Sequence, residues 1–149
     1  MQAITRDDIE LLAPAGSFDC LAAAIRAGAD SVYFGAGALN MRSASSANFS
    51  LDDVRKIARI ASGHGVKTYM TLNSVLFDED VPAMRQALDA AQDAGVSAVI
   101  VSDQAAILYA SSIGLPIHLS TQLSISNFQA LRFYAQWAAV VVLAPELNL

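Results

Sequence analysis

The stretch that decides the fold is residues 98–122, AVIVSDQAAILYASSIGLPIHLSTQ. Its first part, Ala98–Asp103, is a short apolar run rich in valine and isoleucine, which is typical of a buried strand. Gln104–Ile113 then repeats its apolar residues with helical spacing and stops at Gly114, the residue type that most readily ends a helix. Ile117–Gln122 is a second strand-type run. A strand, a helix and another strand joined by short turns predict one βαβ unit of a parallel sheet.

The same alternation runs along the rest of the chain. Strand-type runs are found at Ile9–Pro14, Ser31–Gly35, Val66–Asn73, Ala98–Asp103, Ile117–Gln122 and Val140–Glu146. Helix-type stretches lie between them, at Phe18–Ala27, Leu51–His64, Val81–Ala94, Gln104–Ile113 and Asn127–Trp137. Strand starts separated by roughly 20 to 35 residues fit the repeating unit of a (β/α)8 barrel. A doubly wound sheet is the alternative, but its GxGxxG phosphate turn is absent after the first two strands.

We therefore predict an α/β fold of the parallel (β/α) TIM-barrel type, incomplete, with six strands and five helices. A chain of 149 residues has the size of one domain, so we expect residues 1–149 to be a single domain, the N-terminal portion of a (β/α)8 barrel. Hydrophobic residues make up 54% of the chain and charged residues 15%, as expected for strands buried on both faces. A barrel that stops after six strands leaves two unpaired edges, which predicts self-association or a complementing chain.

Composition narrows the classes of function. The net charge is −5, so this part of the chain lacks the basic surface that binds nucleic acid; RNA would be reached only through a longer protein. No apolar run approaches the ~20 residues of a membrane span, and the N-terminus has no apolar signal region. We therefore expect no membrane contact and a cytoplasmic location. Cys20 is the only cysteine, so the sequence predicts no metal site in this chain.

Polar residues close the strands, and in a barrel the carboxyl ends of the strands carry the active site. The candidate ligand-binding residues are Arg42, Asn48, Asn73, Ser120, Thr121 and Gln122, and the candidate catalytic residues are Glu146 and Asp103. Amides and hydroxyls on one rim favour a small polar or anionic ligand. Arg42 is the natural anion partner because it is the only basic residue in these loops. Asp103 has a second interpretation, as the N-cap of the helix that follows it.

The sequence contains no motif of a familiar hydrolase. His64 ends a helix, where an imidazole complements the helix dipole, and His118 lies inside a strand. No Ser/His/Asp order, HExxH or CxxC spacing is present, so neither a protease triad nor a zinc site is predicted. No lysine closes a strand, which disfavours a Schiff-base aldolase.

Several stretches resemble one known family. ELLAPAGS at 10–17, AGADSVYFG at 27–35 and Met41-Arg42 with ANFS at 47–50 resemble the start of the peptidase U32 family. HLSTQ at 118–122 with Asn127, and VLAPEL at 142–147, resemble its later motifs. The resemblance covers essentially the whole chain, in order. It implies a (β/α) barrel protein of a family labelled collagenase-like peptidases, of which several members act in RNA hydroxylation and use an iron–sulfur cluster. The cluster cysteines lie beyond the region covered, so the resemblance implies no cofactor in this chain and a cluster only with the C-terminal region.

Two functions stay open at this point. The first is the N-terminal barrel portion of a U32-type protein that, in its full-length form, supports RNA hydroxylation rather than proteolysis; this portion alone is expected to be inactive. The second is a non-catalytic binding or assembly subunit that completes a barrel with another chain. The sequence does not decide whether the chain is itself an enzyme.

Overall fold

The computed structural model describes residues 5–41 and 48–147. The strands are β1 (Leu12–Pro14), β2 (Ser31–Gly35), β3 (Lys67–Leu72), β4 (Ala98–Val101), β5 (Ile117–Leu119) and β6 (Val140–Val141). The helices are α1 (Phe18–Arg26), α2 (Leu51–Gly63), α3 (Val81–Ala94), α4 (Gln104–Ser112) and α5 (Phe128–Tyr134). Short 3₁₀ helices lie in the connections, namely η1 (Arg6–Asp8), η2 (Asp78–Asp80) and η3 (Thr121–Leu123).

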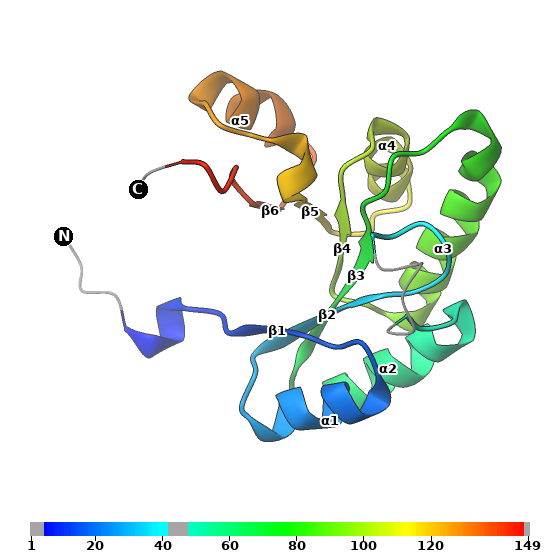
Figure 1. Cartoon of the computed structure of the whole chain (residues 1–149), viewed down its shortest axis with the longest axis vertical. Coiled ribbons are helices and arrows are strands. Elements are labelled where there is room, and N and C mark those ends of the chain that lie inside the picture. Colours follow the sequence, from blue (N-terminus) through cyan, green and yellow to red (C-terminus); the bar gives the residue numbers. More distant parts are fainter. Residues whose placement is uncertain (1–4, 42–47, 148–149) are drawn as a thin grey trace.

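The strands form one parallel sheet in the order β1-β2-β3-β4-β5-β6. Figure 1 shows this sheet curling, with α1 to α4 packed on one side of it and the opposite, inner side left uncovered. Neighbours in the chain are neighbours in the sheet, as expected when each helix carries the chain from one strand to the next. Over the described residues, the predicted incomplete parallel (β/α) barrel with six strands and five helices is confirmed.

The core lies between the sheet and the helices. Successive strand residues point to opposite faces, and Val32, Phe34 and Met70 are fully buried. The helices add fully or almost fully buried side chains at Leu21, Val54, Ile57, Leu88 and Ile107. Each such side chain contributes roughly 1.5–3 kcal/mol to the stability of the fold. The alternate strand residues, among them Tyr69, Ile100 and His118, face the inner side of the curled sheet.

Local capping sets the ends of the helices. At the start of α2, the backbone N–H of Asp53 donates to Ser50 Oγ at 3.3 Å, and the N–H of Ser50 donates to Asp53 Oδ2 at 3.1 Å. This reciprocal pair satisfies two N–H groups that the helix leaves free. Helix α3 ends at Gly95, whose φ of 70° lies in the left-handed region that glycine adopts without a steric penalty.

Strand β1 is shorter than predicted. It begins at Leu12 rather than Ile9, since the carbonyl of Leu11 accepts the N–H groups of both Asp30 and Ser31 and Ile9 is still the C-cap of η1. No helix in the described part of the chain is long and apolar enough to cross a membrane.

Candidate functional site

The carboxyl ends of β3, β4 and β5 meet at one rim, joined by side-chain hydrogen bonds. Asn73 follows β3, and its Nδ2 donates to Gln122 Oε1 at 3.3 Å. Ser102 follows β4, and its Oγ donates to the backbone carbonyl of Asn73 at 3.2 Å. Ser120 follows β5, and its Oγ donates to Gln122 Oε1. We call Asn73, Ser102, Ser120 and Gln122 the rim network. The structure brings the predicted residues Asn73, Ser120 and Gln122 together and adds Ser102 to them. The role of the predicted residues in binding a ligand stays a prediction.

The connection from β2 to α2 reaches the same network. The backbone N–H of Met41 donates to Asn73 Oδ1 at 3.3 Å. Arg42, the predicted anion partner, lies outside the described residues. Met41, the residue before Arg42, is thus hydrogen-bonded to the residue that follows β3.

Asn48 lies at the other end of that connection and makes structural contacts. Its Nδ2 donates to the carbonyl of Gly37 at 2.6 Å, and its Oδ1 accepts from Asn40 Nδ2 at 3.1 Å. Asn40 is almost fully buried and also donates to the Gly37 carbonyl at 3.1 Å. Both amide groups press against Gly35, where an added Cβ would lie 2.4 Å from Asn40 Oδ1. Asn48 therefore holds the connection in place, and its contact with a ligand stays a prediction.

The remaining candidates are Asp103, Thr121 and Glu146, of which Asp103 and Thr121 are next in sequence to members of the rim network. The Asp103 carboxylate accepts the N–H of Ala105 at 2.8 Å and caps α4, as its second interpretation predicted. Thr121 begins η3, beside Gln122, and is half-buried. Glu146 is exposed in a turn after β6. In the described part of the chain, neither carboxylate bonds to the rim network, so their catalytic role also stays a prediction.

A second polar cluster, which sequence reasoning missed, lies at the amino ends of the strands. Glu10 Oε1 accepts from Tyr69 Oη at 2.5 Å, and Glu10 Oε2 accepts from Lys67 Nζ at 2.8 Å. The ring of His118 lies against Tyr69, with 4.5 Å between ring centroids. Glu10 is separated from its two partners by 57 and 59 residues, so no local pattern could have revealed the cluster.

The environment shifts the titration of this amino-end cluster. Burial raises the pKa of Glu10, but hydrogen bonds from Lys67 and Tyr69 outweigh it and lower this pKa to about 2. Burial, followed by the hydrogen bond to the Glu10 carboxylate, raises the pKa of Tyr69. Burial lowers the pKa of His118 below its ordinary value. The cluster therefore holds a charged carboxylate beside a neutral tyrosine at neutral pH.

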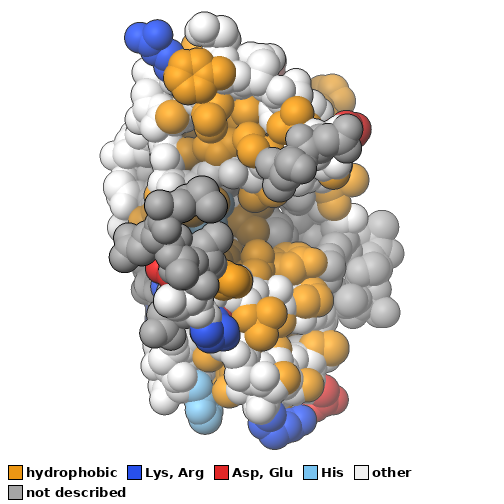
Figure 2. Space-filling view, turned by 90° about the vertical axis from the view of Figure 1, so that its left-hand side faces the viewer, with side chains coloured by type: hydrophobic (Ala, Val, Ile, Leu, Met, Phe, Trp, Pro, Cys, Tyr) orange, Lys and Arg blue, Asp and Glu red, His pale blue; other side chains and the backbone are white. Residues whose placement is uncertain are grey.

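This cluster lines one end of a hollow on the inner side of the sheet. The hollow measures about 350 Å³ and is otherwise lined by Leu12, Ile100, Val140 and Val142. Figure 2 shows apolar side chains gathered on this side of the molecule. Exposed apolar residues lie at or beside both edge strands, namely Ile9, Leu11 and Leu12 near β1 and Val140, Val142 and Leu143 near β6. The inner side is thus apolar in its middle. The rim network lies at the carboxyl ends of the strands, and the cluster of Glu10, Lys67 and Tyr69 lies at their amino ends.

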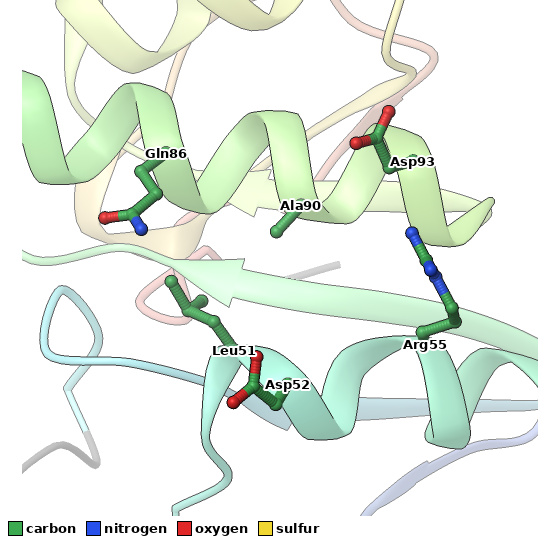
Figure 3. A pocket seen from close by; sticks show the side chains of 6 residues that line it. All are labelled: Leu51, Asp52, Arg55, Gln86, Ala90 and Asp93. Carbon is green, nitrogen blue, oxygen red and sulfur yellow. The ribbon is translucent and has the colours of Figure 1, made fainter.

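Another hollow, of about 300 Å³, lies between α2 and α3 (Figure 3). It is lined by Leu51, Asp52, Arg55, Gln86, Ala90 and Asp93. These side chains come from the helical layer and share no residue with the rim network. Within the described residues, no group of three or more His, Cys, Asp and Glu side chains is arranged to hold a metal ion.

Comparison with known proteins identifies a family whose sequences this chain matches. The sequence profile of peptidase family U32 matches residues 16–149. The chain is 57% identical over 143 residues, 96% of its length, to a protein named collagenase from Porphyromonas gingivalis (strain ATCC BAA-308 / W83). It is 34% identical over 142 residues, 93% of its length, to tRNA hydroxylation protein P1 from Bacillus subtilis (strain 168). These alignments cover 34% and 33% of the two relatives, so the chain spans about a third of the length of the curated relatives it matches.

A solved structure shows a similar fold. The structure is similar to that of the U32 peptidase Mk0906, with a TM-score of 0.76 and 16% sequence identity over 99% of this chain and 64% of that chain. The family profile extends from the turn after β1 to the last residue of the chain. The chain therefore belongs to peptidase family U32.

Proposed function

We propose that the chain forms the amino-terminal part of the barrel of a U32 protein that acts in RNA hydroxylation rather than in peptide hydrolysis. The observation that carries this proposal is the bonding of the rim serines. Ser102 Oγ donates to a backbone carbonyl, and Ser120 Oγ donates to the carboxamide of Gln122. Neither acceptor takes up a proton at neutral pH, so neither serine has the base that activates a hydrolytic nucleophile.

The rim network is instead suited to recognition. Neutral amides and hydroxyls on three neighbouring strands can bind a polar ligand with defined hydrogen-bond geometry. Arg42, next to the tied Met41, is proposed to pair with an anionic group of that ligand. RNA itself would be bound by other parts of the longer protein, since the net charge here is −5.

The residues of this chain do not fit an iron–sulfur cluster. Such clusters are held by several cysteine thiolates. Cys20 is the only cysteine, and it is exposed in the first turn of α1. We propose that any cluster of the longer protein is bound outside residues 1–149.

The proposal can be tested by analysing the RNA of cells that lack the gene. Mass spectrometry of nucleosides from tRNA and rRNA should show the loss of a hydroxylated nucleoside, restored by the wild-type gene and reduced when the gene carries Gln122→Ala. Gln92→Ala, an exposed change on α3, should restore it fully. Unchanged RNA in the deleted strain, with cleavage of denatured collagen by the purified protein, would contradict the proposal.

One observation favours a second function, as a subunit that completes a barrel with another chain. Strands β1 and β6 are the edges of the sheet, and both carry exposed apolar residues. Unpaired edges with apolar side chains are templates for pairing with further strands. We propose that these edges pair with polypeptide beyond residues 1–149 or with a second chain.

A further inference from the structure

The hydrogen bonds of the rim network have a direction that one backbone group determines. A backbone N–H can only donate. The N–H of Met41 lies 3.3 Å from the carboxamide of Asn73, so the atom that it contacts is the oxygen, Oδ1. The nitrogen, Nδ2, must then occupy the other branch of the Asn73 side chain, which faces Gln122 at 3.3 Å.

The orientation of Gln122 follows by the same logic. A carboxamide nitrogen donates and does not accept, so the Gln122 atom that faces Asn73 Nδ2 is Oε1. The hydroxyl of Ser120 contacts the same Oε1 and therefore donates to it. Both lone pairs of this oxygen are used, one by Asn73 and one by Ser120. The hydrogen-bonding capacity that Gln122 keeps is that of its Nε2 group, which has two N–H donors.

We propose that this network locks Gln122 as a hydrogen-bond donor, which presents Nε2 to a carboxylate or carbonyl oxygen of the ligand. Gln122 is then the residue that selects the ligand, and Asn73 and Ser120 are positioning residues that hold its amide group in one orientation. The inference rests on the proposed function in taking the rim as the ligand site, and it adds the chemical class that this site accepts.

Burial makes the lock effective. Ser120 is only 4% exposed, so its hydroxyl has little access to water as an alternative partner. The backbone of Asn73 is held by Ser102 Oγ at 3.2 Å. Gln122, in contrast, is exposed, so a ligand can reach its Nε2 group. A ligand that offers only N–H donors, such as an alkylammonium ion, would find the acceptor oxygen of Gln122 already occupied.

The side-chain amide resonances of the protein test this inference by ¹⁵N NMR. Acetate should shift the Gln122 Nε2 resonance in a saturable way, and methylammonium should leave it unchanged. Gln122→Glu keeps an oxygen for Ser120 and Asn73 but removes the donor. Acetate affinity, followed on the Asn73 side-chain resonance, should then fall at least about tenfold, the cost of losing a hydrogen bond to a charged group. Gln92→Glu adds the same charge on exposed α3 and should bind acetate as the wild type does.

A second variant tests the lock itself. Asn73→Asp keeps the acceptor for Met41 but removes the donor to Gln122, so the Gln122 amide should turn and give its Nε2 to the new carboxylate. Acetate should then no longer shift Gln122. The inference is overturned if acetate leaves wild-type Gln122 unshifted, if methylammonium shifts it equally, or if either variant responds to acetate as the wild type does. RNA that keeps all its hydroxylated nucleosides, alongside the expected acetate response, would overturn the proposed function and leave this inference standing.

Discussion

Contacts formed in the folded chain shift the titration of Glu10. Its pKa is lowered to about 2 in the folded chain from an ordinary value of 4.5. A carboxyl group with a lowered pKa stabilises the fold above its unfolded pKa and loses that effect as the pH falls toward its folded pKa. The Glu10 side chain is 37% exposed, so screening by solvent limits its contribution to about 1 kcal/mol.

Glu10→Gln should therefore lower the free energy of unfolding by about 1 kcal/mol at pH 7. The difference from the wild type should shrink steadily between pH 4.5 and pH 2, the window between the unfolded and folded pKa values. Urea unfolding at several pH values measures this. Glu79→Gln, in the exposed 3₁₀ helix η2, removes a carboxylate outside this cluster and is the matched control. A constant difference across that window would show that the charge of Glu10 is not its source.

At the scale of elements, the junction between β2 and α2 depends on the absence of a side chain at Gly35. A Cβ there would lie 2.4 Å from Asn40 Oδ1 and 3.0 Å from Asn48 Oδ1. Asn40 is almost fully buried and bonds to the carbonyls of Ala36 and Gly37, so it has little room to move. The end of β2 and the connection from β2 to α2 are therefore held together by the close packing of Asn40 and Asn48 against Gly35.

Gly35→Ala should destabilise the fold by about 1–3 kcal/mol, the usual cost of overpacking a filled site. It should also weaken the bond between Met41 and Asn73, because the connection would shift. Gly63→Ala, at the end of α2 with no atom near the added Cβ, is the control and should be neutral or stabilising by up to about 1 kcal/mol. Urea unfolding of both variants measures the change in the free energy of unfolding. Equal changes in the two variants would contradict a role for the close packing at Gly35.

On the scale of the whole molecule, the curled sheet has two apolar edges. The inner hollow is lined by residues near both β1 and β6, and Val142 and Leu143 beside β6 are exposed. Burying these residues against a second chain removes apolar surface from water, which is favourable at roughly 25 cal/mol per Å². We therefore expect the chain to self-associate when no complementing polypeptide is present.

Sedimentation velocity over a wide range of concentrations should show a species larger than the monomer. Val142→Lys, which places a charge beside the β6 edge, should shift the population toward the monomer. Val75→Lys, an exposed change in the loop after β3, should leave the distribution as it is. A wild-type chain that stays monomeric at every concentration would argue against the pairing of these edges.

The order and type of the elements could be predicted because their signals are local. The β-branched runs at 31–35, 98–101 and 117–119 alternate with helical stretches, and strands β2, β4 and β5 begin where predicted. The serine and aspartate that start α2 are three residues apart and form a capping pair, which is also a local signal. Asn73 and Gln122 could likewise be placed at one end of the sheet, because each closes a strand of the same parallel set.

The tertiary structure alone decided which of these polar groups touch and how they are oriented. Asn73 and Gln122 are 49 residues apart, and Glu10 and Tyr69 are 59 apart, so their contacts depend on the register and curvature of the sheet. The donor role of Gln122 depends further on one N–H, that of Met41, which belongs to another connection. Periodicity along a chain reports which face a residue takes, because side-chain direction repeats with the backbone. It carries no information on hydrogen bonds between distant segments, since these form only after the sheet has closed the distance between them.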